Sequence, residues 1–463
     1  MKHASINRSR SSRLAVETWL TMPDASVVFA RQSSRLPVGA SEEARTTIEV
    51  STSHRYQSMD GFGFTLTEGS ADLIGQLAPA KRKALLRQLF STKPNGIGIS
   101  CLRLGIGATD LSYTPYSYDE VPRRQTDLEL EYFDIDADDN QIVSLLQDIV
   151  KINKKLMIIA TPWSAPRWMK TKYSYRGGSL RTRYSDVYAK YIVKVINKMK
   201  DCGIEINVIT PQNEPLYKGN VPSMGMSAAQ QAKFIKKYLG PAIREAQLND
   251  VAIFCYDHNC NRFDYPLKVL ADTEARQFIK GVAWHLYKGK IGALSKVGEK
   301  YHIKTYFTEQ AVIAKWSFGE NLRWHVRNIL VGAIRNGAEA VLEWNLASDI
   351  DHRPHTRGGC NVCVGAITID ASTIVHNASY CVIAHLSRFV RPGSVRIFSS
   401  ANDSLPNVAF ETPNGQIVLL VLNDSSGVQQ FNIEFNQKIA TVILQKGAVA
   451  TYVWQSECAS AIV

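Results

Sequence analysis

The chain has 463 residues, of which 45% are hydrophobic and 21% charged, so it has the composition of a folded globular protein rather than a disordered or fibrous one. Its formal net charge is +12, but the basic residues are spread along the chain, with short runs only at Asn7–Arg13, Lys151–Lys155 and Lys233–Lys237. A nucleic-acid-binding protein usually gathers them beside a recognisable motif. We therefore expect a solvated basic surface, with weak peripheral attraction to anionic lipid headgroups as the alternative, and no nucleic-acid partner.

The sequence gives limited information on location. No apolar stretch of a secretory signal follows the basic, serine-rich segment Met1–Arg13, and no run reaches the roughly 18 apolar residues that span a bilayer. The eight cysteines are Cys101, Cys202, Cys255, Cys260, Cys360, Cys363, Cys381 and Cys458. Their scattered positions, several in apolar stretches, favour buried thiols in a reducing compartment. We expect a cytoplasmic protein or one exported by a non-classical route.

From Gly61 onward, short apolar runs alternate with longer amphipathic stretches. The apolar runs are Gly61–Leu66, Ile99–Leu104, Leu156–Trp163, Ile206–Thr210, Val251–Tyr256, Val282–Leu286, Thr305–Thr308 and Ala340–Trp344. Their brevity and lack of polar alternation are typical of strands buried on both faces of a parallel sheet. The helix-like stretches include Ala80–Phe90, Tyr184–Cys202, Ser227–Leu239 and Leu322–Asn336. This alternation predicts an α/β fold, a (β/α)₈ TIM barrel over residues 61–377, whose functional groups gather at the C-terminal strand ends.

The pattern changes after Asn377. The short strand-like runs that follow are Val395–Phe398, Asn407–Glu411, Ile417–Asn423, Phe431–Phe435, Thr441–Leu444 and Ala450–Trp454. Turn dipeptides such as Asn414-Gly415 separate them, which predicts an accessory all-β sandwich over residues 378–463. Ala15–Ala30 and Thr46–Ser51 also resemble strands. We therefore expect residues 1–60 to contribute strands to the same sandwich.

Two glutamates follow predicted barrel strands. Glu214, in Thr210-Pro211-Gln212-Asn213-Glu214-Pro215, comes after the fourth strand, and Glu309 ends the seventh. Hydrolysis of a glycosidic bond with retention needs two carboxyl groups about 5–5.5 Å apart, one protonated and one ionised. A single strand-end glutamate is more often an exposed rim residue than a catalytic one. Their combination, with an asparagine before the first, points to a glycosidase.

These motifs resemble those of glycoside hydrolase family 30, on the side of the family that contains the bacterial-type glucosylceramidase (glucocerebrosidase)-like enzymes. The matching landmarks, in order, are Gly61-Phe62-Gly63, Thr161-Pro162-Trp163-Ser164-Ala165-Pro166-Arg167-Trp168-Met169-Lys170, Gln212-Asn213-Glu214-Pro215, His285-Leu286-Tyr287 and Trp344-Asn345-Leu346-Ala347. The resemblance runs from about Val16 to Trp454. It implies a (β/α)₈ barrel with a side β-sandwich, Glu214 as the general acid/base and Glu309 as the nucleophile.

Other site residues carry over from the resemblance one at a time. Trp163, Asn213 and Trp344 match positions that shape the sugar pocket, where an indole offers an apolar platform and one N–H donor. Tyr287 matches a tyrosine near the nucleophile. Glu68 stands where glucosylceramidases have an aspartate that holds distal glucose hydroxyls, and its extra methylene leaves the sugar open.

The roles of three further residues and of one loop stay open. Asp257 and His258 follow the fifth predicted strand, where a place at the barrel mouth and an ordinary loop role fit equally. His285 is expected to be a structural histidine. The loop His352–Cys363 carries two histidines and a Cys-x-x-Cys pair, which fit ordinary thiols best, then a local disulfide, then a structural zinc site.

We therefore expect a retaining β-glycosidase that hydrolyses β-glucosides such as glucosylceramide, a reaction of lipid metabolism, through a covalent glycosyl-enzyme and without a metal or organic cofactor. The alternative is a β-1,6-glucanase or another β-glycosidase of the same family. A more remote alternative is a carbohydrate- or lipid-binding protein without activity. The expected partner is a glycoside or glycolipid substrate, while the aglycone and the oligomeric state stay open.

Overall fold

The computed structural model describes residues 14–32, 46–135 and 141–456. The basic run at Asn7–Arg13, the segment Met1–Arg13 and Cys458 lie outside these residues. The chain divides into two compact units. One holds the described residues up to Ser58 together with those from Gly393 on, and the other spans Met59–Pro392.

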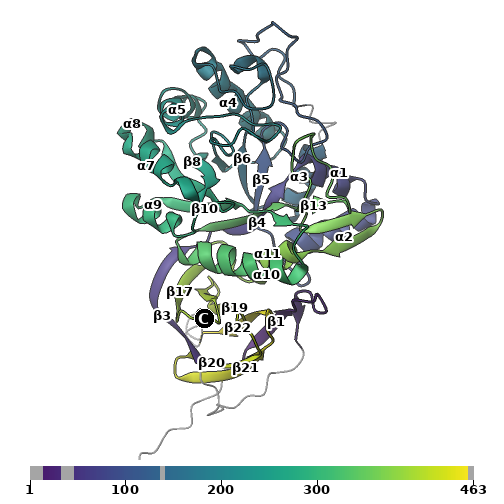
Figure 1. Ribbon diagram of the computed structural model, residues 1–463, viewed down its shortest axis with the longest axis vertical. Helices are drawn as coiled ribbons and strands as arrows, with labels where there is room; N and C mark the ends of the chain where they lie inside the picture. Colours follow the sequence, from purple (N-terminus) through teal and green to yellow (C-terminus); the bar gives the residue numbers. More distant parts are fainter. Residues whose placement is uncertain (1–13, 33–45, 136–140, 457–463) are drawn as a thin grey trace, which may run out of the picture. The chain divides into compact units, whose positions relative to one another are not determined.

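The second unit is a closed barrel of parallel strands (Figure 1). Its strands are β4 (Gly61–Leu66), β5 (Cys101–Gly105), β6 (Met157–Thr161), β7 (Val208–Ile209), β8 (Ala252–Asn259), β9 (Ile279–His285), β10 (Lys304–Glu309) and β12 (Ala340–Asn345). Each strand pairs with the next in chain order, and β12 closes the ring on β4. The predicted (β/α)₈ barrel with an accessory β-sandwich is therefore confirmed.

Helices cover the outside of this barrel. The α-helices of the described residues are α1 (Glu68–Gly75), α2 (Pro79–Phe90), α3 (Gln141–Ile152), α4 (Ser185–Asp201), α5 (Ala228–Phe234), α6 (Gly240–Glu245), α7 (Asp264–Ala271), α8 (Thr273–Arg276), α9 (Ala293–Tyr301), α10 (Phe318–His325) and α11 (Ala378–Ser387). Single turns are η1 (Arg167–Met169), η2 (Thr182–Tyr184) and η4 (Cys260–Arg262). The π-helical segments η3 (Ile235–Leu239) and η5 (Val326–Ala333) continue α5 and α10, as the long amphipathic patterns predicted.

Apolar side chains fill the barrel interior at the end where the strands begin. This cluster consists of Cys101, Ile159, Val208, Phe254, Ala283, Tyr306, Ala340 and Leu342. Gly63 lies where a Cβ would overlap the backbone of Cys101, so the close approach of β4 and β5 requires glycine. Val208, Phe254 and Tyr306 of this cluster also line an open cavity at this end, but the functional groups of such barrels gather at the opposite, C-terminal end.

Two small sheets lie beyond the barrel strands. β11 (Val312–Ile313) pairs with β14 (Cys363–Val364), and β13 (Ala347–Ser348), β15 (Ile367–Asp370) and β16 (Thr373–His376) form the other. Both follow directly from the C-terminal ends of β10 and β12. They therefore fix the chain next to the predicted site.

The first unit is the predicted β-sandwich. Its strands are β1 (Glu17–Thr21), β2 (Ala30–Arg31), β3 (Thr46–Ser58), β17 (Val395–Ser399), β18 (Asn407–Glu411), β19 (Gln416–Leu422), β20 (Gln429–Phe435), β21 (Lys438–Leu444) and β22 (Val449–Gln455). They form one hydrogen-bonded row, in which β1 pairs with β22 and β3 lies between β17 and β20. Buried residues from both halves of the row, such as Ile48, Leu419, Phe431 and Ala450, share one core. The N-terminal segment thus contributes strands as predicted.

The boundary after the barrel lies later than the sequence suggested. Residues 378–392, assigned to the sandwich from the change of pattern after Asn377, belong to the barrel unit. They contain α11, all of whose residues are buried and which packs against β4, β12 and α10. A helix buried on all sides has no amphipathic period, so the pattern gave no sign of it.

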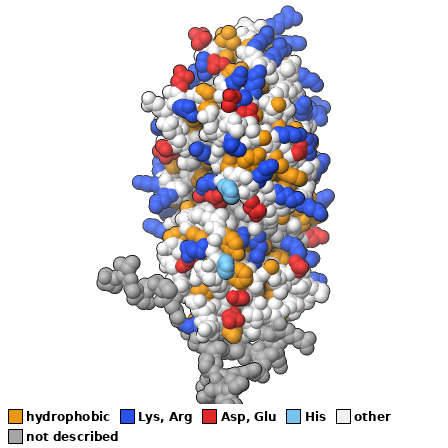
Figure 2. Space-filling model, turned by 90° about the vertical axis from the view of Figure 1, so that its left-hand side faces the viewer, with side chains coloured by type: hydrophobic (Ala, Val, Ile, Leu, Met, Phe, Trp, Pro, Cys, Tyr) orange, Lys and Arg blue, Asp and Glu red, His pale blue; other side chains and the backbone are white. Residues whose placement is uncertain are grey.

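The described residues contain no helix that is long and apolar enough to cross a membrane. On the face in Figure 2, Lys and Arg side chains are scattered among acidic, apolar and other side chains rather than gathered in one continuous patch. This distribution agrees with a solvated basic surface.

Candidate active site

A cavity of about 550 Å³ lies at the C-terminal ends of the barrel strands. Its lining consists of Asp110, Trp163, Glu214, Leu216, Tyr217, Asn220, His258, Asn259, Asn261, Arg262, Tyr287, Lys288, Glu309, Ala311, Ile313, Trp344, Cys360 and Cys363. The two predicted glutamates therefore face one cavity, although they are far apart in the sequence. Both are largely buried, with exposed fractions of 8% for Glu214 and 6% for Glu309.

The strands are irregular where they present these side chains. The pairing of β9 and β10 shifts register between Phe307 and Glu309, and that of β8 and β9 shifts between Tyr256 and His258. Such bulges re-aim the side chains that follow them. The backbone at Glu214 and Asp257 has φ of 42° and 63°, in the left-handed region that non-glycine residues rarely adopt. Strain of this kind is typical of functional sites.

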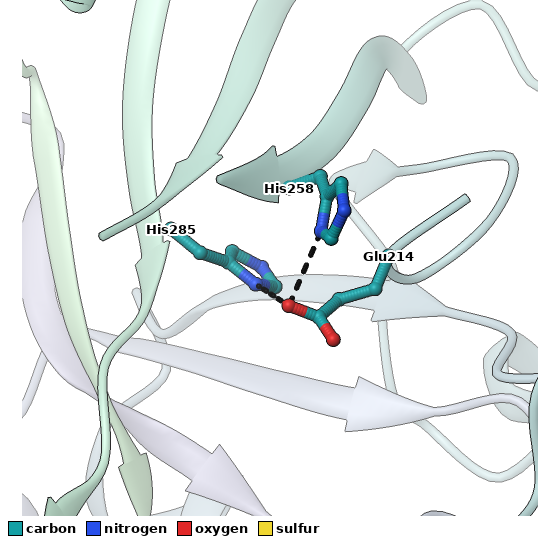
Figure 3. A group of neighbouring side chains, drawn as sticks. All are labelled: Glu214, His258 and His285. Carbon is teal, nitrogen blue, oxygen red and sulfur yellow. Dashed lines mark hydrogen bonds and ion pairs between the residues drawn. The ribbon is translucent and has the colours of Figure 1, made fainter. Parts of the chain in front are cut away.

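Two histidines surround the Glu214 carboxylate. Figure 3 shows both imidazole rings directed at its Oε1, with Nδ1 of His258 at 3.2 Å and Nδ1 of His285 at 3.3 Å. Burial alone would raise the pKa of Glu214, but the two neighbouring imidazoles outweigh it and lower this pKa to about 2. Burial likewise opposes the charge of His285, yet Glu309, Asp257 and Glu214 raise its pKa to about 9. His285 therefore carries a proton next to Glu214 at neutral pH.

Glu309 is held by a cation and a phenol. Nη1 of Arg103 donates to its Oε2 at 2.6 Å, and the hydroxyl of Tyr287 donates to its Oε1 at 3.0 Å. Nδ1 of His285 lies 3.7 Å from the same Oε1. Each of these contacts stabilises an ionised carboxylate, which is the form that a nucleophile needs.

Arg103 is fully buried and joins Glu309 to the rest of the site. Its Nη2 donates to Oδ1 of Asn213 at 2.6 Å and to Oδ2 of Asp257 at 2.9 Å. Burial opposes ionisation of Asp257, but Arg103 and His285 hold its pKa far below the usual range. Asp257 in turn accepts a hydrogen bond from Nε2 of the protonated His285 at 3.1 Å. A continuous charged network thus fixes both glutamates.

One atom gives an upper limit for the separation of the two glutamates. Because Nδ1 of His285 lies 3.3 Å from Oε1 of Glu214 and 3.7 Å from Oε1 of Glu309, these oxygens are at most about 7 Å apart, a limit compatible with the ~5–5.5 Å of retaining glycosidases. The cavity therefore brings two carboxyl groups close enough to act on one anomeric carbon.

Two indoles form an apolar wall beside these carboxylates. The rings of Trp163 and Trp344 lie 5.5 Å apart between centroids, and both line the cavity. The guanidinium of Arg103 lies 4.7 Å from the centre of the Trp163 ring. A wall of this kind can pack against the apolar face of a pyranose.

Asp110 adds a third carboxyl group to the cavity. Burial, and then the charge of Glu309, raise its pKa to about 7. The backbone N–H of Cys360 donates to its Oδ2 at 3.4 Å. Cys360 is joined to Cys363 by a disulfide, so the expectation of ordinary thiols in this loop is corrected, and these sulfurs are not ligands of a zinc site. The bridge is possible because the two Cα atoms are 5.7 Å apart.

The predicted substrate-binding residues do not all line the cavity. Trp163, Tyr287 and Trp344 do, whereas Asn213 lies behind it, bound to Arg103. Glu68 is outside the lining, at the first turn of α1, and its Oε2 is buried without a hydrogen bond. Burial, opposed by the hydroxyl of Ser112, raises the pKa of Glu68. Its contact with a sugar stays a prediction.

Sequence reasoning missed Arg103 and Asp110. Arg103 is the one charged residue inside the apolar run Ile99–Leu104, and a charge in a strand buried on both faces needs a partner. The charge inside an apolar run could therefore have indicated Arg103 from the sequence. Asp110 lies in the loop after β5, where polar residues are common, and only the fold brings it to the cavity.

A (β/α)₈ barrel with two carboxylates on one cavity at its C-terminal end is the arrangement of a glycoside hydrolase. Residues 59–323 match the model of the glycosyl hydrolase family 30 TIM-barrel domain, and residues 393–452 match that of the glycosyl hydrolase family 30 beta sandwich domain. The chain belongs to glycosyl hydrolase family 30. It is a retaining β-glycosidase that acts on a glycoside substrate.

Three relatives illustrate the range of specificity. The endo-1,6-beta-D-glucanase of Neurospora crassa is 32% identical over 369 residues, which cover 77% of this chain and 75% of the relative. The lysosomal acid glucosylceramidase of Mus musculus is 26% identical over 445 residues, covering 88% and 85%. The solved structure of the endo-beta1,6-glucanase BT3312 has a TM-score of 0.88 and 31% identity, over 96% of this chain and 100% of the other.

Proposed function

We propose that this protein is an endo-acting β-1,6-glucanase that works by double displacement, with Glu309 as nucleophile and Glu214 as general acid/base. The observation that carries the catalytic part is the pair of glutamates on one cavity, each with different partners. Arg103 and Tyr287 each donate a hydrogen bond to Glu309 and hold its carboxylate in place. Glu214 instead contacts two imidazoles, and His285 can share its proton with the carboxylate.

In the first step, a carboxylate oxygen of Glu309 forms a bond to the anomeric carbon while the bond to the leaving oxygen breaks. Glu214 passes to that oxygen the proton that it receives from His285. In the second step, a water molecule loses a proton to Glu214, and its oxygen bonds to the anomeric carbon as Glu309 leaves. Glu309 is again a carboxylate, the proton taken from water returns from Glu214 to His285, and the product keeps the β configuration.

The proton for the first step comes from the Glu214–His285 pair. Because the pKa of Glu214 is about 2 and that of His285 about 9, the pair carries one proton across neutral pH. The contact of 3.3 Å between Nδ1 and Oε1 gives this proton a direct path to the carboxylate. Movement to Glu214 is favoured when a bound sugar excludes water and a basic leaving oxygen develops next to it.

The outer part of the cavity favours a glucan over a glycolipid as the substrate. The exposed lining residues are Leu216, Tyr217, Asn261, Arg262, Tyr287 and Lys288. Hydrogen-bond donors and phenol rings dominate this set, which suits the hydroxyls and ring faces of further sugar units. One aliphatic side chain offers little apolar area to the two hydrocarbon chains of a ceramide. The 31–32% identity to two β-1,6-glucanases supports the same choice.

The test compares hydrolysis of a linear β-1,6-glucan with that of β-1,3- and β-1,4-glucans and of glucosylceramide in detergent. Wild type should release short β-1,6-linked oligosaccharides from the first substrate only, and early products should have the β anomeric configuration by NMR. Release of glucose from glucosylceramide with no action on the glucan would overturn the glucanase assignment and restore the glucosylceramidase expectation.

The roles of the glutamates are tested separately. Glu309→Gln should abolish turnover, and a 2-fluoro glucoside should label Glu309 in the wild type, as read by peptide mass spectrometry. Glu214→Gln should still release an activated aryl group in a first burst but stall before the second step. Normal turnover of glucan by either variant would refute these assignments.

A further inference from the structure

We infer that Glu214, His258 and His285 form a binding site for a divalent transition metal ion of the zinc type, and that an ion bound there blocks the enzyme. These three residues offer one ligand atom each, and the three atoms lie within 4.8 Å of one another. They come from the loop after β7 and from the C-terminal parts of β8 and β9, and Figure 3 shows them converging on one point.

The spacing fits the coordination sphere of zinc. Nitrogen and oxygen ligands lie 2.0–2.1 Å from a tetrahedral ion, so two ligand atoms are separated by roughly 3.3–3.4 Å. Oε1 of Glu214 lies 3.2 Å from Nδ1 of His258 and 3.3 Å from Nδ1 of His285. Two of the three distances between ligand atoms are therefore already close to those of tetrahedral coordination.

His258 supplies an independent indication of a ligand. Its Nδ1 is buried 3.2 Å from Oε1 of Glu214 in a geometry that does not make a hydrogen bond, and the side chain is only 8% exposed. A buried ring nitrogen that lacks a well-aligned hydrogen bond costs free energy that a metal bond would recover. Because His258 and Glu214 also line the cavity, an ion from solution can reach them, and a water molecule can fill its fourth position.

The surroundings complete the site. Nε2 of His285 lies 3.1 Å from Oδ1 of Asp257, the carboxylate–histidine arrangement that orients many metal-bound imidazoles. The carboxylates of Glu214, Asp257 and Glu309 face Arg103 and the proton-carrying His285. An ion bound to Nδ1 of His285 displaces that proton, and the group then has a formal charge of minus two, which one divalent ion balances. Imidazole ligands favour zinc or copper over magnesium or calcium.

The inhibitory part of this inference rests on the proposed role of Glu214 as acid/base, but the binding part does not. A metal bond to Oε1 would occupy the oxygen that gives and takes the proton. It would also hold His285 away from its role in supplying that proton. Metal binding and glycoside hydrolysis would then exclude each other.

The experiment measures zinc binding to the whole protein without substrate, by titration calorimetry with zinc chloride, and the visible spectrum after addition of cobalt(II). The variants are His258→Ala, the more conservative His258→Gln, and His54→Gln as the control. His54 is exposed on β3 of the sandwich unit, far along the chain from the site. Inhibition of glucan hydrolysis by zinc, and its reversal by a chelator, is recorded for each protein relative to its own metal-free rate.

Wild type and His54→Gln should bind one zinc ion and give the intense cobalt spectrum of tetrahedral coordination, and magnesium should not compete. Both His258 variants should bind zinc at least ~10-fold more weakly and should resist inhibition by the same factor. No zinc binding by wild type, or equal binding by folded His258 variants, would overturn the inference. Binding is read without turnover, so absence of glucanase activity would count against the proposed function and leave the metal site standing.

Discussion

Replacing Arg103 with methionine should damage both stability and catalysis. Arg103 is fully buried and lies 2.6 Å from Glu309 and 2.9 Å from Asp257, so its removal leaves two buried carboxylates without their cation. Breaking a buried ion pair from one side typically costs about 3–5 kcal/mol. We expect a loss of that size in the free energy of unfolding at pH 7, with glucan hydrolysis reduced to near background because Glu309 is no longer held.

The loss should depend on pH in a defined direction. In the wild type, Asp257 has a pKa far below its unfolded value, so its contribution to stability is present above about pH 4 and lost as the pH falls through the folded pKa. Without Arg103, burial raises the pKa of Asp257 instead, and acidification then neutralises the uncompensated charge. The difference in stability between the two proteins should therefore be largest at neutral pH and shrink toward pH 4.

Urea unfolding followed by tryptophan fluorescence tests this reasoning, since Trp163 and Trp344 lie beside the guanidinium. Arg103→Lys is the matched control, because it keeps the charge but loses the planar fork that reaches three acceptors. It should retain more stability than Arg103→Met and still lose most activity. A stability loss that is the same at pH 7 and pH 4, or an active Arg103→Met enzyme, would refute the electrostatic account.

Three further predictions concern single side chains. The pKa of Asp110 is raised from 3.8 to about 7, so ionisation of its carboxyl group destabilises the folded state as the pH rises through this range. Asp110→Asn should therefore stabilise the protein at pH 8 by up to about 4 kcal/mol and leave its stability at pH 3 unchanged. A variant whose denaturation curves equal those of the wild type at both pH values would contradict this. His285→Gln removes the group that loses its proton near pH 9 and lets the pKa of Glu214 rise. The alkaline limb of the pH profile of kcat/KM should therefore move to lower pH. A limb that does not move would exclude a proton shared between Glu214 and His285. Gly63→Ala should cost several kcal/mol in thermal unfolding, because its Cβ would overlap a carbonyl of β5. Gly292→Ala should be tolerated, because its Cβ would meet only Oδ1 of Asn336 at an ordinary contact distance of 3.8 Å. The reverse order would disprove the packing argument.

The barrel was predictable because its strands are buried on both faces and therefore uniformly apolar. The run Gly61–Leu66, for example, coincides with β4. The same logic hid Arg103, which lies inside such a run. Its partners Glu309, Asn213 and Asp257 are 206, 110 and 154 residues away, and no local pattern records contacts of that range.

The residues that surround the two glutamates could not be predicted without the three-dimensional fold. Family motifs pointed to Glu214 and Glu309, but the place of His258 at the cavity depends on a bulge in β8 that shifts its register against β9. The loop after β12 likewise gave no sequence sign that separates free thiols from the Cys360–Cys363 bridge. Such features follow from three-dimensional proximity rather than from residue type and spacing.

The place of β3 between β17 and β20 affects how the protein is made. The hydrogen bond between Glu49 and Ser400 joins residues separated by 351 positions, so the neighbours of β3 leave the ribosome long after β3 itself. At ~5–20 residues per second, roughly 20–70 s pass before Ile48 and Val50 can be covered. During that time the barrel segment can be completed while an apolar N-terminal strand waits unpaired. Each nascent chain therefore carries an aggregation-prone edge through most of its own synthesis, and chaperone protection of its first sixty residues should matter more than their small share of the fold suggests.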